Sequence, residues 1–80
     1  MVSIRNIKRM GNLLSCDYYP GDKEYGGSIV VDIVSKKTVE FSSVDKSENM
    51  YSSSPNTARL RLLEFADAEV FPEKAFAFWY

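Results

Sequence analysis

We expect the sheet to form around the segment IVVDIV, residues 29–34, which is the most apolar and β-branched run in the chain. In a strand, successive side chains point to opposite faces, so Ile29, Val31 and Ile33 share one face and Asp32 lies on the other. The first face is wholly apolar and the second is mixed. The segment therefore predicts a central strand with a helix over its apolar face and its other face partly open to water.

Two strands, separated by a tight turn at Gly11-Asn12, are expected before this segment over residues 2–10 and 13–19. An uninterrupted pairing from the turn divides their side chains between two faces. Lys8 falls on the face away from the core. The predicted core face carries Ile7 opposite Cys16, Arg5 opposite Tyr18, and also Leu14 and Arg9.

The hairpin that follows residues 29–34 can close with loops of different lengths. A two-residue or four-residue loop would set Ile33 opposite Glu40, which places a charged side chain on the apolar face. A three-residue loop over residues 36–38 instead sets Ile33 opposite Phe41 and gathers the apolar side chains together. We therefore predict the three-residue loop.

A helix is predicted after a serine-rich crossing segment, because Ser54-Pro55 has the pattern of an N-cap followed by proline in the first turn. The helix should run for about 13 residues. Leu60 falls outside its apolar stripe. The stripe itself comprises Ala58, Leu62, Leu63, Phe65 and Ala66.

Small and aromatic residues alternate over residues 74–80, after Pro72, and predict a fifth strand. Antiparallel pairing with the first strand gives the order 4-3-2-1-5, and the alternative places the fifth strand parallel to the fourth. The expected fold is α+β, with a two-layer, five-stranded, mainly antiparallel sheet and one helix across one face. Residues 1–80 should form a single domain.

Composition excludes several classes of function. The chain has 80 residues, 45% of them hydrophobic, and a net charge of −1. It therefore has no overall positive electrostatic potential that would attract nucleic acid. No segment has the length of a signal peptide core or a membrane span, so we expect no membrane partner. A single cysteine, Cys16, cannot form an internal disulfide, which favours the cytoplasm. Placed beside Ile7, its thiol should be inert.

Three features stand out together: the segment CDYYP at residues 16–20, the helix that bears alanine and arginine, and the terminal Trp79-Tyr80. In these features the chain resembles a loose set of small, uncharacterised bacterial proteins. The resemblance implies a β-β-β-β-α-β fold and a bacterial or phage cytoplasmic setting. It carries over no activity and no functional residues.

The sequence predicts no catalytic, cofactor-binding or metal-binding residues, and histidine, the commonest general base, is absent. We interpret the chain as a small non-enzymatic protein-interaction or regulatory module, a monomer or weak homodimer. Acidic residues crowd the C-terminal end of the predicted helix, where the helix dipole disfavours them. Either nearby cations compensate them or they are kept for a partner. The candidate partner-binding residues are Glu64, Asp67, Glu69 and Tyr19.

Single-stranded nucleic-acid binding by the first hairpin is the alternative. Arg5, Lys8 and Arg9 are its candidate residues, and Tyr18 and Tyr19 could stack on bases. The acidic isoelectric point, near 5.3, and the split of these cations between two faces disfavour it.

Overall fold

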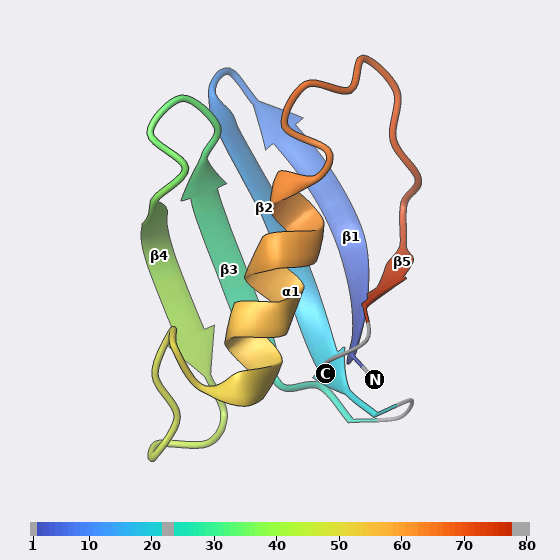
Figure 1. Ribbon diagram of the computed structural model, residues 1–80. Coiled ribbons are helices and arrows are strands. Elements are labelled where there is room, and N and C mark those ends of the chain that lie inside the picture. The colour runs from blue at the N-terminus through green and yellow to red at the C-terminus, as the bar shows by residue number, and fades with distance from the viewer. Residues whose placement is uncertain (1, 22–23, 78–80) are drawn as a thin grey trace.

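The computed structural model describes residues 2–21 and 24–77, which fold into strands followed by a helix and a short last strand (Figure 1). The hydrogen-bonded order is β4-β3-β2-β1-β5, and every pair is antiparallel. Along the described chain the elements are β1 (Val2–Met10), β2 (Leu13–Pro20), β3 (Gly27–Asp32), β4 (Thr38–Ser43), α1 (Ser53–Leu63) and β5 (Ala75–Ala77).

The expected five-stranded sheet needs a correction at its C-terminal end. The sheet proper is an antiparallel sheet of four full strands, β1 to β4, and the strand expected over residues 74–80 is reduced to the three residues of β5 in the described chain. These pair with Val2–Ile4, so β5 begins next to the part of β1 where its register shifts, between Arg5 and Lys8. Trp79 and Tyr80, expected in that strand, lie outside the described residues. The fold is thus a small α+β fold with four full strands and one helix.

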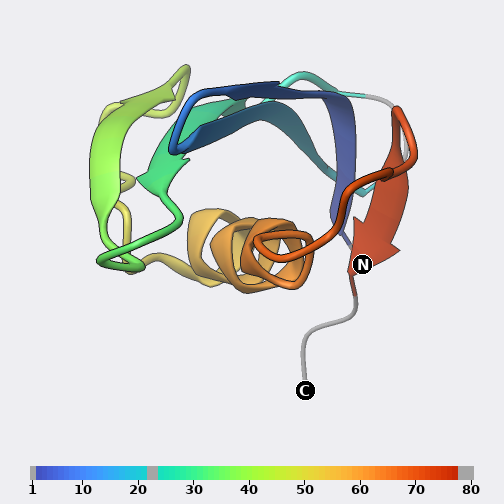
Figure 2. The same cartoon turned by 90° about the horizontal axis from the view of Figure 1, so that it is seen from above.

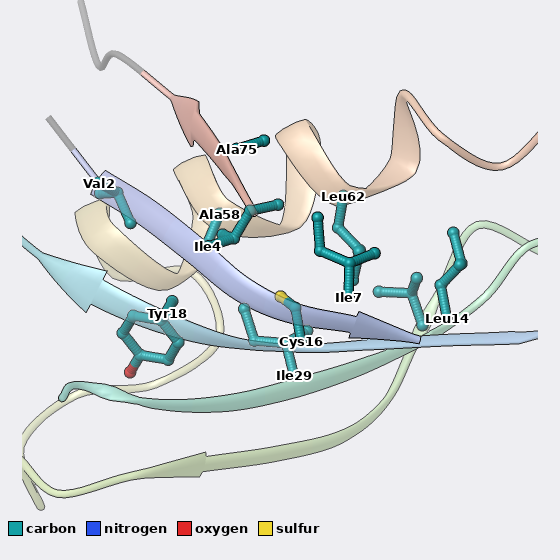
Figure 3. Packing of buried hydrophobic residues seen from close by; sticks show 11 residues of the cluster. Val2, Ile4, Ile7, Leu14, Cys16, Tyr18, Ile29, Ala58, Leu62 and Ala75 are labelled. Atoms are coloured by element: carbon teal, nitrogen blue, oxygen red, sulfur yellow. The ribbon is translucent and has the colours of Figure 1, made fainter. Parts of the chain in front are cut away.

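The sheet curls around α1, which lies on its concave side (Figure 2). Over the part of the chain that the structure describes, no second layer covers the convex side. Aliphatic side chains from β1, β2 and β3 meet the helix on the concave side and exclude water, which is the main stabilising term of a fold this small (Figure 3). The buried cluster comprises Val2, Ile4, Ile7, Leu14, Cys16, Tyr18, Ile29, Val31, Ala58, Leu62 and Ala75.

A β-bulge in β1 corrects the expected register of the first hairpin. Pairing follows the expectation from the turn to Lys8, and then two residues of β1, Asn6 and Ile7, lie opposite Cys16. Arg5 consequently pairs with Asp17 on the convex side instead of entering the core. The physical reason is burial: an uninterrupted register would bury the Arg5 charge and expose Val2 and Ile4, which are fully buried here.

Asn6 makes this bulge possible because it adopts the left-handed conformation, with φ of 56°. Its side-chain amide also donates a hydrogen bond to the Asp17 carboxylate at 2.8 Å. Asparagine tolerates this conformation better than residues with longer or branched side chains do.

We expect Asn6→Ala to lower the free energy of unfolding by about 1 to 2 kcal/mol, because alanine meets a steric cost at positive φ and cannot bond to Asp17. Urea denaturation of the purified variant measures this loss. Asn6→Gly is the matched control, since it also removes the side-chain bond but suits the backbone, and it should lose less than half as much. Equal losses in the two variants would show that backbone conformation contributes nothing.

The hairpin between β3 and β4 also differs from the expectation. Ile29, not Ile33, lies opposite Phe41, and Val39 is an extra residue on β4 where the register shifts. The predicted three-residue loop is wrong because β3 already ends at Asp32. The Asp32 carboxylate accepts hydrogen bonds from the backbone N–H groups of the next turn, at 2.8 Å from Val34, and so stabilises a longer loop.

The helix begins earlier than predicted and also ends earlier, at Leu63, so the expected apolar stripe is confirmed only in part: Phe65 and Ala66 follow the helix. Its N-cap is Ser52, whose hydroxyl accepts a hydrogen bond from the backbone N–H of Asn49, so Ser54 lies inside the first turn. Ala58 and Leu62 are fully buried against the sheet, whereas Leu60 is 53% exposed. The Ser52 side chain thus bonds back to the crossing segment and makes no capping hydrogen bond to the helix.

A buried tyrosine anchors that crossing segment to the sheet. The Tyr18 side chain is fully buried, and its hydroxyl donates a hydrogen bond of 2.5 Å to the Glu48 carboxylate. The hydroxyl of Ser43 lies 2.6 Å from the same oxygen. Burial, together with the bond to Glu48, raises the pKa of Tyr18 above its usual range. The phenol therefore stays protonated and keeps donating to Glu48.

Candidate functional site

The best candidate site is a depression on the convex side, at the bulge of β1, with a volume of about 720 Å³. We call it the convex hollow. One wall comes from β1 and β2, and the other comes from the segment that leads into β5. The backbone N–H of Ile7 donates to the carbonyl of Glu73 at 3.1 Å and holds the second wall against the bulge. The lining residues are Arg5, Asn6, Tyr19, Pro72, Glu73 and Lys74.

An arginine stacked on a tyrosine lines the convex hollow. The guanidinium carbon of Arg5 lies 4.2 Å from the centroid of the Tyr19 ring, within the range of a cation–π interaction. The ring of Tyr25 packs edge-on against Tyr19, with 5.7 Å between the ring centroids. Both partners of the stack are half-buried. Arg5 and Tyr19 therefore present a positioned planar cation and an aromatic ring at one place on the surface.

Ser3 adds an unsatisfied polar group next to this hollow. It pairs with Tyr19 across the sheet, and its side chain is only 2% exposed. Within the described structure, its hydroxyl has no hydrogen-bond partner. Such a group typically costs about 1 to 3 kcal/mol, so native proteins keep few of them. This cost lowers the stability of the pair of strands β1 and β2, which form one wall of the hollow.

The structure separates the four candidate partner-binding residues that the sequence indicated. Tyr19 lines the convex hollow near the end of β2, whereas Glu64, Asp67 and Glu69 are exposed at the other end of the molecule, where α1 ends (Figure 1). Glu64 forms an ion pair of 3.1 Å with Arg61. No ion pair with Asp67 or Glu69 occurs among residues 2–21 and 24–77. The acidic residues and Tyr19 therefore belong to two different surfaces.

The bulge in β1 also changes the sheet face on which the candidate nucleic-acid-binding cations lie. Arg5 and Lys8 lie on the convex face with Tyr19, because each pairs with a residue of β2 that points away from the core. Arg9 lies on the concave side, and its Nε–H donates to the carbonyl of Gly11 at 3.0 Å. The expectation that Arg5 and Arg9 share a face opposite Lys8 is corrected.

Sequence reasoning missed most of the convex hollow. It identified Arg5 and Tyr19 separately but assigned them to opposite faces, and it gave no role to Asn6, Pro72 or Glu73. One signal was present in the sequence: an uninterrupted register placed a charged Arg5 in the core and an apolar Ile4 outside. A single extra residue in β1 relieves that conflict.

The chemistry available elsewhere in the described chain is limited. No three residues of the types His, Cys, Asp or Glu come close enough there to hold a metal ion. Burial raises the pKa of the Cys16 thiol from 9.0 to about 12, and the neighbouring Asp17 charge adds to the effect. The reactive thiolate is therefore scarce at neutral pH. None of the described helices is both long and apolar enough to traverse a bilayer.

Cys16 should consequently react with thiol reagents only when the protein unfolds. At pH 8 we expect native labelling to be at least about a hundredfold slower than labelling of the unfolded chain, because burial blocks access to the thiol and the raised pKa keeps the thiolate scarce. Absorbance of a released aromatic thiol follows the reaction, and the same chain in denaturant is the control. Native labelling as fast as that of the chain in denaturant would contradict the buried, protonated state.

No family model, curated protein or solved structure matches this chain.

Proposed function

We propose that this chain is a small non-enzymatic protein-interaction module, with a regulatory role, that binds its partner through the convex hollow. The observation that carries this proposal is the Arg5–Tyr19 stack on a sheet face that no described element covers. Arginine and tyrosine are enriched among the residues that dominate binding energy at protein interfaces. Because the two side chains are already held against each other, binding costs less side-chain entropy.

The absence of histidine from the sequence and the raised pKa of the buried thiol of Cys16 support a non-enzymatic role. The single cysteine, which forms no disulfide, supports a reducing cytoplasm. The bacterial or phage origin that we propose rests on the resemblance to small bacterial proteins alone. We propose a monomer or weak homodimer with a protein partner and no cofactor.

The test compares two tyrosine variants that undergo the same chemical change. Tyr19→Ser alters the convex hollow, and Tyr51→Ser alters a tyrosine that is 77% exposed on the crossing segment. Each tagged variant is used to capture proteins from lysate of the source cells, and any captured protein is then purified and titrated by calorimetry. We expect a partner that binds the wild-type chain and Tyr51→Ser equally and binds Tyr19→Ser at least about tenfold more weakly.

The acidic residues at the end of α1 supply an alternative surface for the same function. The double variant Asp67→Lys with Glu69→Lys tests it in the same titration. Retention of the partner by Tyr19→Ser and its loss by the double variant would move the interface to that end of the molecule. Retention by all variants, or no specific partner, would overturn the proposal, provided that circular dichroism shows each variant folded.

A second candidate function is binding of single-stranded nucleic acid. The bulge favours it by placing Arg5 and Lys8 on one face with Tyr19, which gives the cations and the stacking platform that such proteins use. Asp17 lies on the same face and opposes it. Our lead proposal expects no retention of single-stranded oligonucleotides in a low-salt filter-binding assay. Retention that is lost in Lys8→Glu and weakens steeply with salt would instead support nucleic-acid binding.

A further inference from the structure

β4 offers a free sheet edge on the side of the molecule away from β5. It pairs with β3 along one side only, and no described strand lies along its other side (Figure 1). Its outward backbone N–H and C=O groups are therefore open to pairing with an added strand. The strand TVEFSS carries one charged residue, Glu40, and no proline that would prevent such pairing.

A depression lined by positive charge lies beside this edge on the concave side. We call it the basic hollow, and its volume is about 430 Å³. Its described lining includes three cations and no carboxylate, and the first turn of α1, nearby in sequence, also contains no acidic residue. The lining residues are Lys36, Lys37, Thr38, Met50, Tyr51 and Arg59.

The convex side of the same edge has a different character. A shallow depression there is lined by the apolar residues Val30, Val39 and Phe41, together with Glu40, Ser28 and Ser42. Val39 is the extra residue of the β4 bulge and is 50% exposed. An added strand would therefore meet cations on one face and apolar surface with a negative charge on the other.

We infer that the β4 edge binds an extended segment of a partner protein in which acidic and apolar side chains alternate. Backbone hydrogen bonds to β4 supply affinity, and the alternation supplies specificity. Acidic side chains point toward Lys37 and Arg59, while apolar ones lie on Val39. A second copy of this chain fits poorly, because its β4 brings a single acidic residue, together with Lys36 and Lys37.

A designed peptide of about eight residues that alternates glutamate and valine tests this inference, with a peptide of lysine and valine as its control. Backbone amide shifts in a nitrogen-15 NMR titration report the binding site and the affinity. We expect the glutamate peptide to shift the amides of Thr38–Ser43 and the lysine peptide to bind at least about tenfold more weakly. The backbone N–H groups of an added strand point alternately toward β4 and away from it. Methylation of the nitrogens that face β4 should therefore abolish binding, whereas methylation of the other set should leave binding intact.

Two protein variants with the same change of charge complete the experiment. Lys37→Glu should weaken binding of the glutamate peptide about tenfold or more, and Lys8→Glu on the convex face should leave it unchanged. Tyr19→Ser should also leave it unchanged, which separates this surface from the proposed function of the convex hollow. Equal binding of both peptides, no binding, or equal effects of the two lysine variants would overturn the inference. Shifts of the β4 amides with protein concentration alone would assign the edge to a second copy and also overturn it.

Discussion

Gly27→Ala is expected to lower the free energy of unfolding by about 3 kcal/mol or more, a large share of the stability of a domain this small. Gly27 is buried at the start of β3, opposite Ser43 of β4 and Tyr18 of β2. A methyl group there would overlap the carbonyl group of Ser42 and lie 2.9 Å from the Cα atom of Ser43. Both are backbone atoms of a paired strand, so neither can move without breaking the pairing.

Gly11→Ala is the control for this prediction. Gly11 occupies the first turn with φ of 59°, and nothing lies within 4 Å of the position that its Cβ would take. Alanine there should cost only about 1 kcal/mol, for the left-handed conformation alone. Urea denaturation of both variants measures the difference. A loss in Gly27→Ala no larger than that in Gly11→Ala would show that β4 can withdraw from β3 at little cost.

Gly27 also shows where sequence reasoning about the fold stops. Residues 20–27 contain proline, glycines and charges, which is the composition of a mobile connection, yet Gly26 and Gly27 are buried. The Gly26 N–H donates to the carbonyl of Tyr18 at 2.8 Å, so the chain returns directly along β2. The glycine content of a segment indicates how freely its backbone can move. It does not indicate which strand packs against a given glycine in the folded chain.

Features with a local cause could be predicted. The turn at Gly11-Asn12 sets Met10 opposite Leu13, as expected, and the helical period identifies Ala58 and Leu62 as core residues. Both bulges escaped prediction, because one extra residue in a strand changes no local preference. Each is decided by which side chains the rest of the fold can bury.

The candidate site could be predicted only in part for the same reason. Arg5 and Tyr19 are conspicuous residue types for binding, but their contact depends on the bulge at Asn6. The second wall of the convex hollow comes from Pro72–Lys74, more than 50 residues farther along the chain. The fifth strand was expected from residue 74 onward because its residues suit a strand, whereas its start at Ala75 adjoins the part of β1 where the register shifts.

Leu62→Ala should have the other large effect on stability, a loss of about 2 to 5 kcal/mol. Leu62 is fully buried between α1 and the sheet, among side chains of β1 (Figure 3). Truncation removes its apolar contacts and leaves a cavity that a curled sheet and a single helix close only partly. Thermal and urea denaturation measure the loss.

Leu60→Ala is a matched control, because it makes the same change two residues away on the same helix. Leu60 is 53% exposed, so its truncation should change the free energy of unfolding by no more than about 0.5 kcal/mol. Alanine also forms helix slightly better than leucine, and this gain is common to both variants, so it cancels in the comparison. The difference between the two losses therefore reports burial against the sheet. Similar losses in both variants would mean that the helix is held by its own propensity, and that the concave face is not the core of this domain.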